Sequence, residues 1–352
     1  MRISLQRIAR RHPFLFWALL ILFAYIAYKT SGFEDFIAAD SFDDFRWPPY
    51  VDVKQKIRDN PPSYEAITRI TGVKLAENSP KIYCSQYQLE GPTLRIFVKS
   101  SFSNFEARLM IRSTWGSDAK RAGAEVIFVT GLPVSTQVIS FKEPWPANDM
   151  RNIESLRKLW QEGDEKRDLL IGNFVDSYRN NTRKFVLSLA AAAGLLSNCE
   201  ATDFALFLDD DYLLNVPLLV SLIRSLNKDD PLYSGWKFDS SPFRMFWNKH
   251  AVPLEVYPFD RYPEYISAGA VLLSSNTIHK FAAAIPFVRL YLMDDIYAGI
   301  LAYSIAVSPK HDPRFEFWAR NIEKDEWQGI IAAHGYPPAQ LDRTYKTHLK
   351  LA

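Results

Sequence analysis

The sequence has 352 residues, with 42 Lys plus Arg, 40 Asp plus Glu and 48% apolar residues. This is the composition of an ordinary globular protein, long enough for one large domain or two small ones, and it excludes disorder as the dominant state. The formal net charge of +2 creates no strong field, so we expect no nucleic-acid partner. The two cysteines exclude a disulfide-dense scaffold and a cysteine-rich zinc site.

The N-terminal segment contains an unbroken, uncharged apolar run over residues 14–28. Arginines precede this run and carboxylates follow it, which predicts that the N-terminus lies in the cytosol. These residues are Arg2, Arg7, Arg10 and Arg11 before the run and Glu34, Asp35, Asp40, Asp43 and Asp44 after it. At about 1.5 Å per residue the run covers roughly 22 Å of a hydrocarbon core of about 30 Å. It therefore fits a thin bilayer or needs His12, Pro13 and Lys29 in the interface.

An uncleaved signal anchor is the interpretation that this segment favours. A cleaved signal peptide is the main alternative, because an apolar run of this length also suits one, and a buried core helix is the third. Residues 24–30 have bulky side chains beside each alanine instead of an Ala-x-Ala cleavage site. We therefore expect residues 1–13 to be a cytosolic tail and residues 14–29 to be a transmembrane signal anchor.

The pattern of apolar residues changes near residue 94. Residues 30–90 are mixed acidic, aromatic and proline-containing without sustained periodicity, which predicts a stem. Beyond them, short apolar runs predict strands at 94–98, 126–129, 169–171 and 204–208, and amphipathic stretches predict helices at 105–115, 153–160, 178–196 and 217–226. We expect Asn215 to cap the last of these helices, with Pro217 in its first turn. Strands that alternate with helices predict an α/β fold with a parallel sheet.

Three carboxylates, Asp209, Asp210 and Asp211, follow the buried strand expected at 204–208. The carboxyl end of a strand is where open α/β sheets bind ligands. In an extended chain Asp209 and Asp211 point to one side and Asp210 to the other, and carboxylates this close repel one another unless water or a cation screens them. Such oxygen ligands suit Mg²⁺ or Mn²⁺, which could bridge to a diphosphate. A solvated acidic turn is the alternative.

Five motifs in sequence order resemble the inverting β1,3-glycosyltransferases, the family (glycosyltransferase family 31) that includes β1,3-galactosyl- and β1,3-N-acetylglucosaminyltransferases. The resemblance covers residues 94–315. The matching positions are Arg108, Ile111, Arg112, Thr114, Trp115 and Gly116 of R-x-x-I-R-x-T-W-G; Asp168, Phe174, Asp176, Tyr178, Asn180, Thr182 and Lys184 of a D-to-K motif; the triplet 209–211; Tyr262, Pro263 and Tyr265 of Y-P-x-Y; and Asp294 to Gly299, similar to E-D-V-Y-x-G. Two departures are Leu208, where the family has a basic residue, and Ala268 with Ala270, in a segment where the family has cysteine and glycine. The second departure bears on the acceptor side.

The resemblance implies a GT-A type, Rossmann-like α/β fold with a mostly parallel sheet and flanking helices. It also implies a luminal catalytic domain over residues 91–352, joined by the stem over residues 30–90 to a single-pass type II anchor in the Golgi membrane. A UDP-sugar would be the donor and Mn²⁺ the cofactor. The acceptor would be a glycan on a glycoprotein, a glycolipid or a proteoglycan.

Sugar transfer from a nucleotide diphosphate needs charge neutralisation on the leaving group and a base for the acceptor hydroxyl. A metal on Asp211, with Asp209 or Asp210 assisting, would provide the first. We expect Asp295 to be the base, with Asp294 as its rival, and one base without a protein nucleophile implies inversion at the anomeric carbon. An acidic pair at a helix N-terminus, favoured by the helix dipole, is the alternative for these two residues.

Other site residues are implied by the resemblance alone. It suggests His311 as a metal ligand together with Asp209 and Asp211, although a surface-loop histidine is equally compatible with the sequence. The family motifs imply donor-binding roles for Arg108, Arg112, Asp176, Lys184 and Asp210. Arg108 and Arg112 lie four residues apart on one predicted helix face, where they could contact phosphate or pair with Glu106 or Asp118.

Two functional hypotheses of different class remain. The first is a luminal, metal-dependent glycosyltransferase, with β1,3-galactosyltransfer as the expected reaction and β1,3-N-acetylglucosaminyltransfer as its alternative. The second is a catalytically silent, membrane-anchored carbohydrate-binding relative, which the retained triplet and Asp295 disfavour. Asn180 begins the sequon Asn-Asn-Thr, a candidate glycosylation site. Because the family has cysteines near Cys84 and Cys199, we expect these two to form a bridge in the oxidising lumen, with free thiols as the alternative.

Overall fold

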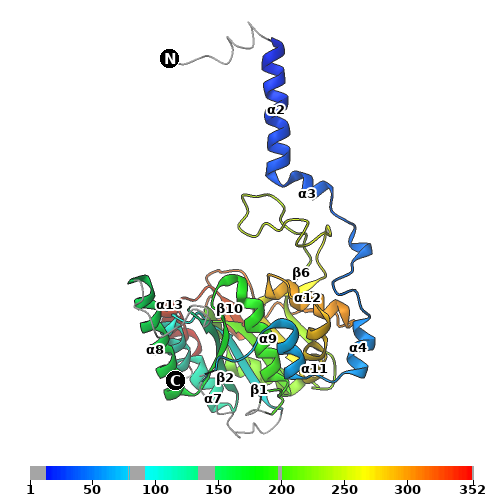
Figure 1. Cartoon of the computed structure of the whole chain (residues 1–352). Coiled ribbons are helices and arrows are strands. Elements are labelled where there is room, and N and C mark those ends of the chain that lie inside the picture. Colours follow the sequence, from blue (N-terminus) through cyan, green and yellow to red (C-terminus); the bar gives the residue numbers. More distant parts are fainter. Residues whose placement is uncertain (1–12, 78, 80–91, 134–146, 197–199, 351–352) are drawn as a thin grey trace, which may run out of the picture. The chain divides into compact units, whose positions relative to one another are not determined.

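The computed structural model describes residues 13–77, 79, 92–133, 147–196 and 200–350, without the side chains of 147–152 (Figure 1). Contacts divide the chain into two compact units. Trp47–Phe238 with Pro263–Ala352 form the larger unit, and Met1–Arg46 with Asp239–Tyr262 form the smaller one. Cys84 and Cys199 lie outside the described residues, so the expected bridge between them stays a prediction.

The larger unit is built on a mixed, mostly parallel sheet with the strand order β3-β2-β1-β4-β7-β6-β8. Its strands are β1 (Leu94–Lys99), β2 (Glu125–Leu132), β3 (Leu169–Val175), β4 (Phe204–Asp209), β6 (Tyr233–Phe238), β7 (Tyr265–Ser274) and β8 (Lys310–His311). Strands β1 to β4 are parallel, and β7 is antiparallel to both β4 and β6. This confirms the α/β class and the four strands predicted from the sequence, and it adds an antiparallel strand that the sequence pattern did not indicate.

Helices flank the sheet, as Figure 1 shows for the labelled elements. The main ones are α6 (Phe105–Ser113), α7 (Trp115–Arg121), α8 (Ala147–Lys166), α9 (Asn181–Ala192), α10 (Val216–Ser225), α11 (Ser275–Ala284), α12 (Asp294–Ser304) and α13 (Pro338–Thr344). Short helical turns are η3 (Tyr178–Asn180), η4 (Ile285–Phe287), η5 (Glu326–Gln328) and η6 (Tyr345–Leu349). Asn215 caps α10 as predicted, because its side chain accepts from the N–H group of Leu218, and Pro217 occupies the first turn.

Central-strand side chains alternate between two apolar layers. Leu206 belongs to the layer in which Trp115 is fully buried. Phe97 and Phe207 face the other layer, where their rings stack 5.6 Å apart and Phe185 of α9 meets Phe207 at 5.2 Å. Strands buried on both faces appear in the sequence as continuous apolar runs, which is why β1 and β4 were predictable.

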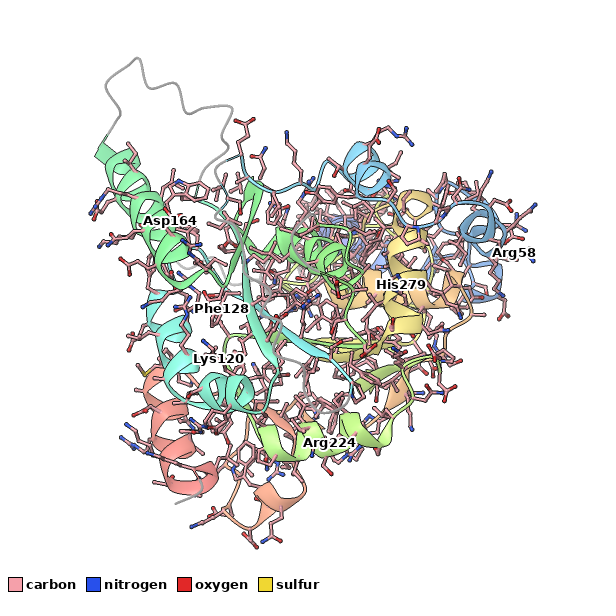
Figure 2. All side chains as sticks on the ribbon, turned by 90° about the horizontal axis from the view of Figure 1, so that it is seen from below. Arg58, Lys120, Phe128, Asp164, Arg224 and His279 are labelled. Atoms are coloured by element: carbon pink, nitrogen blue, oxygen red, sulfur yellow. The ribbon has the colours of Figure 1, made fainter. Side chains whose placement is uncertain are left out.

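Figure 2 labels one side chain of β2 and side chains of three flanking helices, among others. Phe128 of β2 is fully buried, whereas Lys120 of α7, Asp164 of α8 and Arg224 of α10 are exposed. The helices therefore present their apolar faces to the sheet and their charged faces to solvent.

A second, three-stranded sheet has the order β5-β10-β9, and its strand β5 directly follows the triplet in sequence. Its strands are β5 (Tyr212–Leu214), β9 (Phe315–Glu316) and β10 (Ala332–His334). Strands β5 and β10 are antiparallel, with His334 paired to Tyr212. This pairing brings the C-terminal part of the chain beside the acidic triplet.

The segment expected to be a stem is divided between the two units. Helices α4 (Val53–Asp59) and α5 (Tyr64–Thr71) belong to the larger unit, and Ile67 of α5 is fully buried. Leu75 forms an isolated bridge with Gly172, and the Ala76 N–H group donates to the Ile171 carbonyl at 2.8 Å. Residues 47–76 are thus part of the larger folded unit.

The smaller unit contains α2 (Pro13–Ser31), α3 (Phe33–Ile37) and the turn η1 (Phe42–Asp44). None of the 19 residues of α2 is buried, and among the described residues α2 alone is long and apolar enough to cross a membrane. At about 1.5 Å per residue it is roughly 28 Å long, close to the hydrocarbon thickness of a bilayer. This helix matches the anchor expected at residues 14–29.

Candidate active site

An open cavity of about 330 Å³ lies where β1, β3 and β4 end. Its lining comes from three segments that directly follow these strands and from the start of α9. The lining residues are Lys99, Ser100, Ser101, Asp176, Ser177, Tyr178, Asn181, Lys184, Asp209, Asp210 and Asp211. Parallel strands bring their carboxyl ends to one edge of the sheet, so the cavity occupies the usual ligand position of an open α/β fold.

Lys99, the last residue of β1, connects the triplet to the acidic pair at the start of α12. Its ammonium lies 3.0 Å from Asp209 Oδ1 and 2.5 Å from Asp294 Oδ2, and its side chain is 4% exposed. Burial opposes the charged form, but the two carboxylates outweigh it and raise the pKa of Lys99. Burial raises the pKa of Asp209 to about 6, assisted by the charges of Asp294 and Asp211 and opposed by Lys99. Lys99 therefore holds a positive charge among these carboxylates.

Asp294 and Asp295 have different surroundings although they are adjacent. Asp294 is buried and forms an ion pair with Lys99. Asp295 is partly buried, and its Oδ1 atom accepts from the N–H group of Ile296 at 2.8 Å. Burial, together with the charge of Asp294, raises the pKa of Asp295 to about 7, although the Ile296 bond and Lys99 oppose this. Asp295 is therefore the carboxylate of the pair that is suited to exchange a proton near neutral pH.

Asp211 meets His334 of β10. Asp211 Oδ2 lies 3.1 Å from His334 Nε2, and His334 Nδ1 lies 3.1 Å from the Phe317 carbonyl oxygen. The carbonyl can only accept, so Nδ1 carries a proton and Nε2 is the atom turned towards the carboxylate. The hydrogen bond to Asp211 raises the pKa of His334 despite partial burial. With the proton on Nδ1, Nε2 and Asp211 Oδ2 are both acceptors. Their separation of 3.1 Å therefore requires a shared proton or a cation between them.

The second oxygen of Asp211 is suited to accept a bond from a positively charged group. Asp211 Oδ1 is buried, and none of the residues that the structure describes forms a hydrogen bond with it. The Asp211 backbone is fixed, because its carbonyl accepts from the N–H groups of Gly335 at 3.1 Å and Tyr336 at 2.9 Å. An imidazole whose other nitrogen donates to a backbone carbonyl is the usual arrangement of a metal-ligating histidine. Asp211 and His334 therefore fit a divalent cation.

A complete protein cage for a metal is absent from the described part of the chain, where no three His, Cys, Asp or Glu side chains converge on one point. This is compatible with Mg²⁺ or Mn²⁺, which often take one or two protein ligands and complete their shell with water and substrate phosphates. The protein therefore offers a partial site at Asp211 and His334.

Asp210 points to another set of partners, as the alternation within the triplet predicts. Its Oδ2 atom accepts from Asn104 Nδ2 at 2.8 Å. Burial raises the pKa of Asp210, and the charge of Asp211 adds to this, whereas hydrogen bonds from Ser100 and Asn104 oppose it. Asp210 thus lines the cavity while it fastens the segment that follows β1.

Asp176 and Lys184, expected to bind the donor, lie at the cavity and bind each other. Their charged atoms are 2.7 Å apart and both side chains are about 5% exposed or less. Asp176 Oδ2 accepts from the Phe102 N–H group at 2.8 Å, and Lys184 donates to the Ser100 carbonyl at 2.9 Å. Both side chains therefore hold the segment 100–102, which forms one wall of the cavity.

Arg108 and Arg112 do not line the cavity, in contrast to the expected phosphate contact. Arg108 is fully buried and pairs with Glu162 of α8 at 2.7 Å. Arg112 pairs with Glu162 at 2.6 Å and with Asp168 at 2.8 Å, and its guanidinium lies 4.6 Å from the ring centre of Phe128. Arginine is suited to such bidentate pairing. These guanidinium groups join α6 to α8 and to the start of β3, and the local partners considered from the sequence are not used.

His311, the histidine expected to bind the metal, contacts residues of strand β6. It lies on β8, at the edge of the main sheet, where it pairs with Gly235 of β6. Its Nδ1 atom accepts from the Lys237 N–H group at 3.2 Å, and its ring meets the Trp236 ring at 5.0 Å. The geometry thus favours His334 over His311 as the histidine partner of Asp211.

Sequence reasoning missed two residues of the site, Lys99 and His334. Lys99 directly follows the strand predicted at 94–98 and is in register with Asp209 on the parallel neighbour β4, so the strand prediction could have located it. His334 lies 123 residues after Asp211, and no motif linked the two. Only the pairing of β10 with β5 brings them together.

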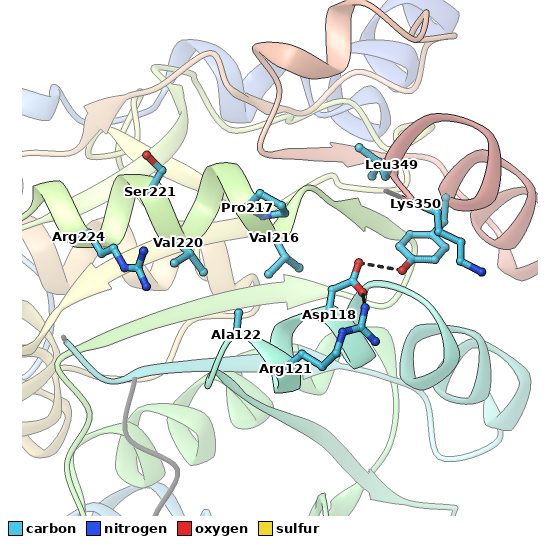
Figure 3. Close-up of a pocket in the computed structure, with 11 residues that line it drawn as sticks. Asp118, Arg121, Ala122, Val216, Pro217, Val220, Ser221, Arg224, Leu349 and Lys350 are labelled. Carbon is cyan, nitrogen blue, oxygen red and sulfur yellow. Dashed lines mark hydrogen bonds and ion pairs between the residues drawn. The ribbon is translucent and has the colours of Figure 1, made fainter. Parts of the chain in front are cut away.

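A larger hollow of about 590 Å³ lies between α7, α10 and the C-terminal turn η6 (Figure 3). Its acidic lining residue, Asp118, accepts from the Tyr345 hydroxyl at 2.8 Å and also pairs with Arg121. Aliphatic side chains such as Val216 and Val220 form much of the remaining wall. This hollow offers no free carboxylate for acid–base chemistry, so the smaller cavity is the better candidate.

Comparison with known proteins identifies the family of the chain. The profile of the Galactosyltransferase family matches residues 147–313, which include the triplet and both candidate bases. The β1,3-galactosyltransferase bre-5 of Caenorhabditis elegans is 34% identical over 317 residues, which cover 89% of this chain and 87% of bre-5. The chain belongs to the β1,3-galactosyltransferase family.

Membership of this family makes the chain an enzyme, a glycosyltransferase. The β1,3-galactosyltransferase brn of Drosophila melanogaster is 29% identical, over 72% of this chain and 73% of brn. Among solved structures, the galactosyltransferase LgtC in complex with donor and acceptor sugar analogs aligns with 73% of this chain and 97% of its own, at 11% identity and a TM-score of 0.34. That similarity is too low to support a conclusion about the site.

Proposed function

We propose that this chain transfers galactose from UDP-galactose to a hydroxyl group of an acceptor glycan, in a metal-dependent reaction that inverts the anomeric carbon. The observation that carries the proposal is a set of charged groups around one cavity at the strand ends. Asp211 lines the cavity and pairs with His334, and Asp295, a partly buried carboxylate of raised pKa, acts through its charge on Tyr178 of the cavity lining. The choice of galactose as the sugar and of a β1,3 linkage rests on the similar proteins bre-5 and brn, which are β1,3-galactosyltransferases.

Asp295 is the proposed general base. A base with a pKa near 7 is half deprotonated at neutral pH and still takes up a proton readily. Asp294 is less suited to this role, because it is buried and its carboxylate is engaged in the ion pair with Lys99. With one base and no protein nucleophile assigned, Asp295 removes the proton from the acceptor hydroxyl while the sugar is displaced directly from the diphosphate.

Asp211 and His334 are the proposed metal ligands, with Asp209 near them, and His334 replaces His311 in this role. A bound Mn²⁺ or Mg²⁺ would neutralise the negative charge that develops on the diphosphate leaving group. Phe317 orients the His334 ring through its carbonyl oxygen, which keeps Nε2 directed to Asp211. Asp210, Asp176 and Lys184 act through the cavity wall at residues 100–102. Arg108 supports the same wall, because it donates to Ser100 Oγ at 3.0 Å and to the Ser101 carbonyl at 2.6 Å, and we assign Arg112 to the fold alone.

The proposed location is the Golgi membrane, with α2 as a type II anchor and the larger unit in the lumen. The basic residues before α2 and the acidic residues after it support this orientation. The glycan acceptor would then be part of a glycoprotein, a glycolipid or a proteoglycan in the same compartment.

A donor panel tests the proposal. The purified full chain would be offered radiolabelled UDP-galactose, UDP-N-acetylglucosamine and UDP-N-acetylgalactosamine with a set of glycan acceptors and Mn²⁺. We expect transfer from UDP-galactose to give a β1,3-linked product, detected by NMR. Transfer from UDP-N-acetylglucosamine alone would replace the donor in the proposal, and the absence of transfer from every donor would contradict it.

A further inference from the structure

The smaller unit carries an exposed aromatic tip that the proposed reaction does not use. Phe243, Phe246 and Trp247 lie within five residues and are 56%, 68% and 67% exposed. The rings of Phe246 and Trp247 meet edge to face at 5.1 Å. Three large apolar side chains so close together on a surface indicate a binding region.

The loop that carries these aromatic residues is held together by a buried arginine. Arg244, between the exposed aromatics, is 6% exposed and donates to three carbonyl oxygens of the same loop. These are the carbonyls of Val252 at 2.7 Å, Tyr257 at 2.8 Å and Phe259 at 2.7 Å. The buried guanidinium closes the loop around itself, so Phe243 and its aromatic neighbours are displayed on a fixed base.

The same loop is joined to the end of α2, as the ribbon of the smaller unit shows in Figure 1. The Phe246 N–H group donates to the Ser31 carbonyl at 3.0 Å. Gly32, with φ of 86°, lies so close to the loop that a Cβ atom there would overlap the Arg244 carbonyl oxygen. Further along, Asp40 accepts from Asp260 at 2.8 Å and donates to the Pro258 carbonyl at 2.9 Å. The tip is thus attached at the residue where α2 ends.

We infer that Phe243, Phe246 and Trp247 insert into the interfacial region of the lipid bilayer that α2 crosses; the inference rests on the proposed anchor. A helix of 19 residues just spans the hydrocarbon, so Ser31 and the loop bonded to it lie at headgroup level. Tryptophan prefers that level. Residues 240–254 contain no Asp or Glu, so the tip carries no carboxylate that the interface would repel.

The short helix α3 of the same unit exposes two further apolar side chains. Phe36 and Ile37, which follow Ser31 by one to two turns, are 60% and 62% exposed. The smaller unit would therefore contact the membrane through α2, α3 and the tip together. Such a contact fixes the orientation of the smaller unit on the lipid surface. A single membrane-spanning helix leaves the unit free to rotate about the helix axis.

Fluorescence quenching by brominated lipid tests this inference. The full chain is placed in phosphatidylcholine nanodiscs, with and without bromine on the acyl chains, and compared with Trp247→Phe and Trp17→Phe. Each substitution removes one fluorophore and keeps an aromatic ring, so the lost component reports that tryptophan. We expect the Trp247 component to be blue-shifted, shielded from acrylamide and quenched by brominated lipid about as strongly as the Trp17 component.

The Trp17 component separates the two proposals, because Trp17 belongs to α2. Lipid quenching of Trp17 together with a red-shifted, acrylamide-quenched Trp247 would overturn the tip inference and leave the anchor in place. A Trp247 shielded from both quenchers would be covered by protein, such as a second copy, and would also overturn it. No lipid quenching of Trp17 would refute the anchor itself, and the tip inference with it.

Discussion

Replacing each member of the acidic pair by asparagine separates catalysis from stability. Asp295→Asn keeps the shape of the side chain and its acceptor oxygen for Ile296, but it cannot take up a proton from the acceptor hydroxyl. We expect kcat to fall by about 10² to 10⁴, the usual contribution of a general base. The free energy of unfolding should not fall, because the substitution removes an ionised group whose burial opposes its charge.

Asp294→Asn should show the opposite pattern. It removes one charge from the ion pair with Lys99, whose side chain is 4% exposed. The amide oxygen can still accept from Lys99, and Asp209 remains 3.0 Å away, so the loss should be about 1 to 3 kcal/mol and not the full cost of a broken buried pair. Chemical denaturation measures this change, and transfer at saturating donor and acceptor measures kcat.

The two variants together decide the assignment. A large fall of kcat in Asp294→Asn, with Asp295→Asn near wild type, would exchange the roles of the two residues. Near-wild-type activity in both would refute the reasoning, because the base would then lie elsewhere. The first turn of α12 turns adjacent side chains about 100° apart, so both cannot face the same atom.

Three further predictions concern the pH dependence of transfer, the role of Arg108 and glycosylation at Asn180. Because the base must be deprotonated and the pKa of Asp295 is raised to about 7, kcat/KM should fall as pH drops through about 7; a rate that stays constant between about pH 5 and 8 would contradict this. Arg108→Met should lower the free energy of unfolding by about 3 kcal/mol, because it leaves Glu162 with one of two partners in a buried network; a loss near zero in urea denaturation would contradict the structural role. Asn180→Gln should remove one glycan from the chain expressed in glycosylating cells, seen as a mobility shift on a gel; an unchanged mobility would show that the site is not used.

Much of the fold was predictable because it is encoded locally. The apolar run of β4, the three carboxylates after it and the cap at Asn215 are all properties of adjacent residues, and the structure has each of them. The antiparallel strand β7 was not indicated, because a continuous apolar run gives no direction to a strand.

The site was less predictable, because its contacts join distant segments. Arg112 was expected to contact phosphate or to pair with a carboxylate near it in sequence, but its partners Glu162 and Asp168 lie 50 and 56 residues away. His334 likewise reaches Asp211 only through the pairing of two short strands. Such contacts depend on strand order and register, which the periodicity of one sequence does not determine.

The segment expected to be a stem also differs from its prediction, because part of it is helical. Residues 30–90 lack sustained periodicity, yet α4 and α5 form within them. Each helix is short and begins at a side-chain cap, Asp52 for α4 and Ser63 for α5. Helices of seven and eight residues are too short to show a repeating pattern, and they are stabilised by packing on the larger unit.

A metal titration of UDP-galactose transfer tests the proposed chemistry most directly. The full chain is stripped with a chelator and then titrated with Mn²⁺, beside Asp211→Asn, His334→Ala and the control His311→Ala. We predict that transfer is lost on stripping, that it returns with Mn²⁺ in the wild type and in His311→Ala, and that it does not return in Asp211→Asn or His334→Ala. Transfer that persists in the stripped wild type, or that returns in Asp211→Asn as it does in the wild type, would contradict the proposed site.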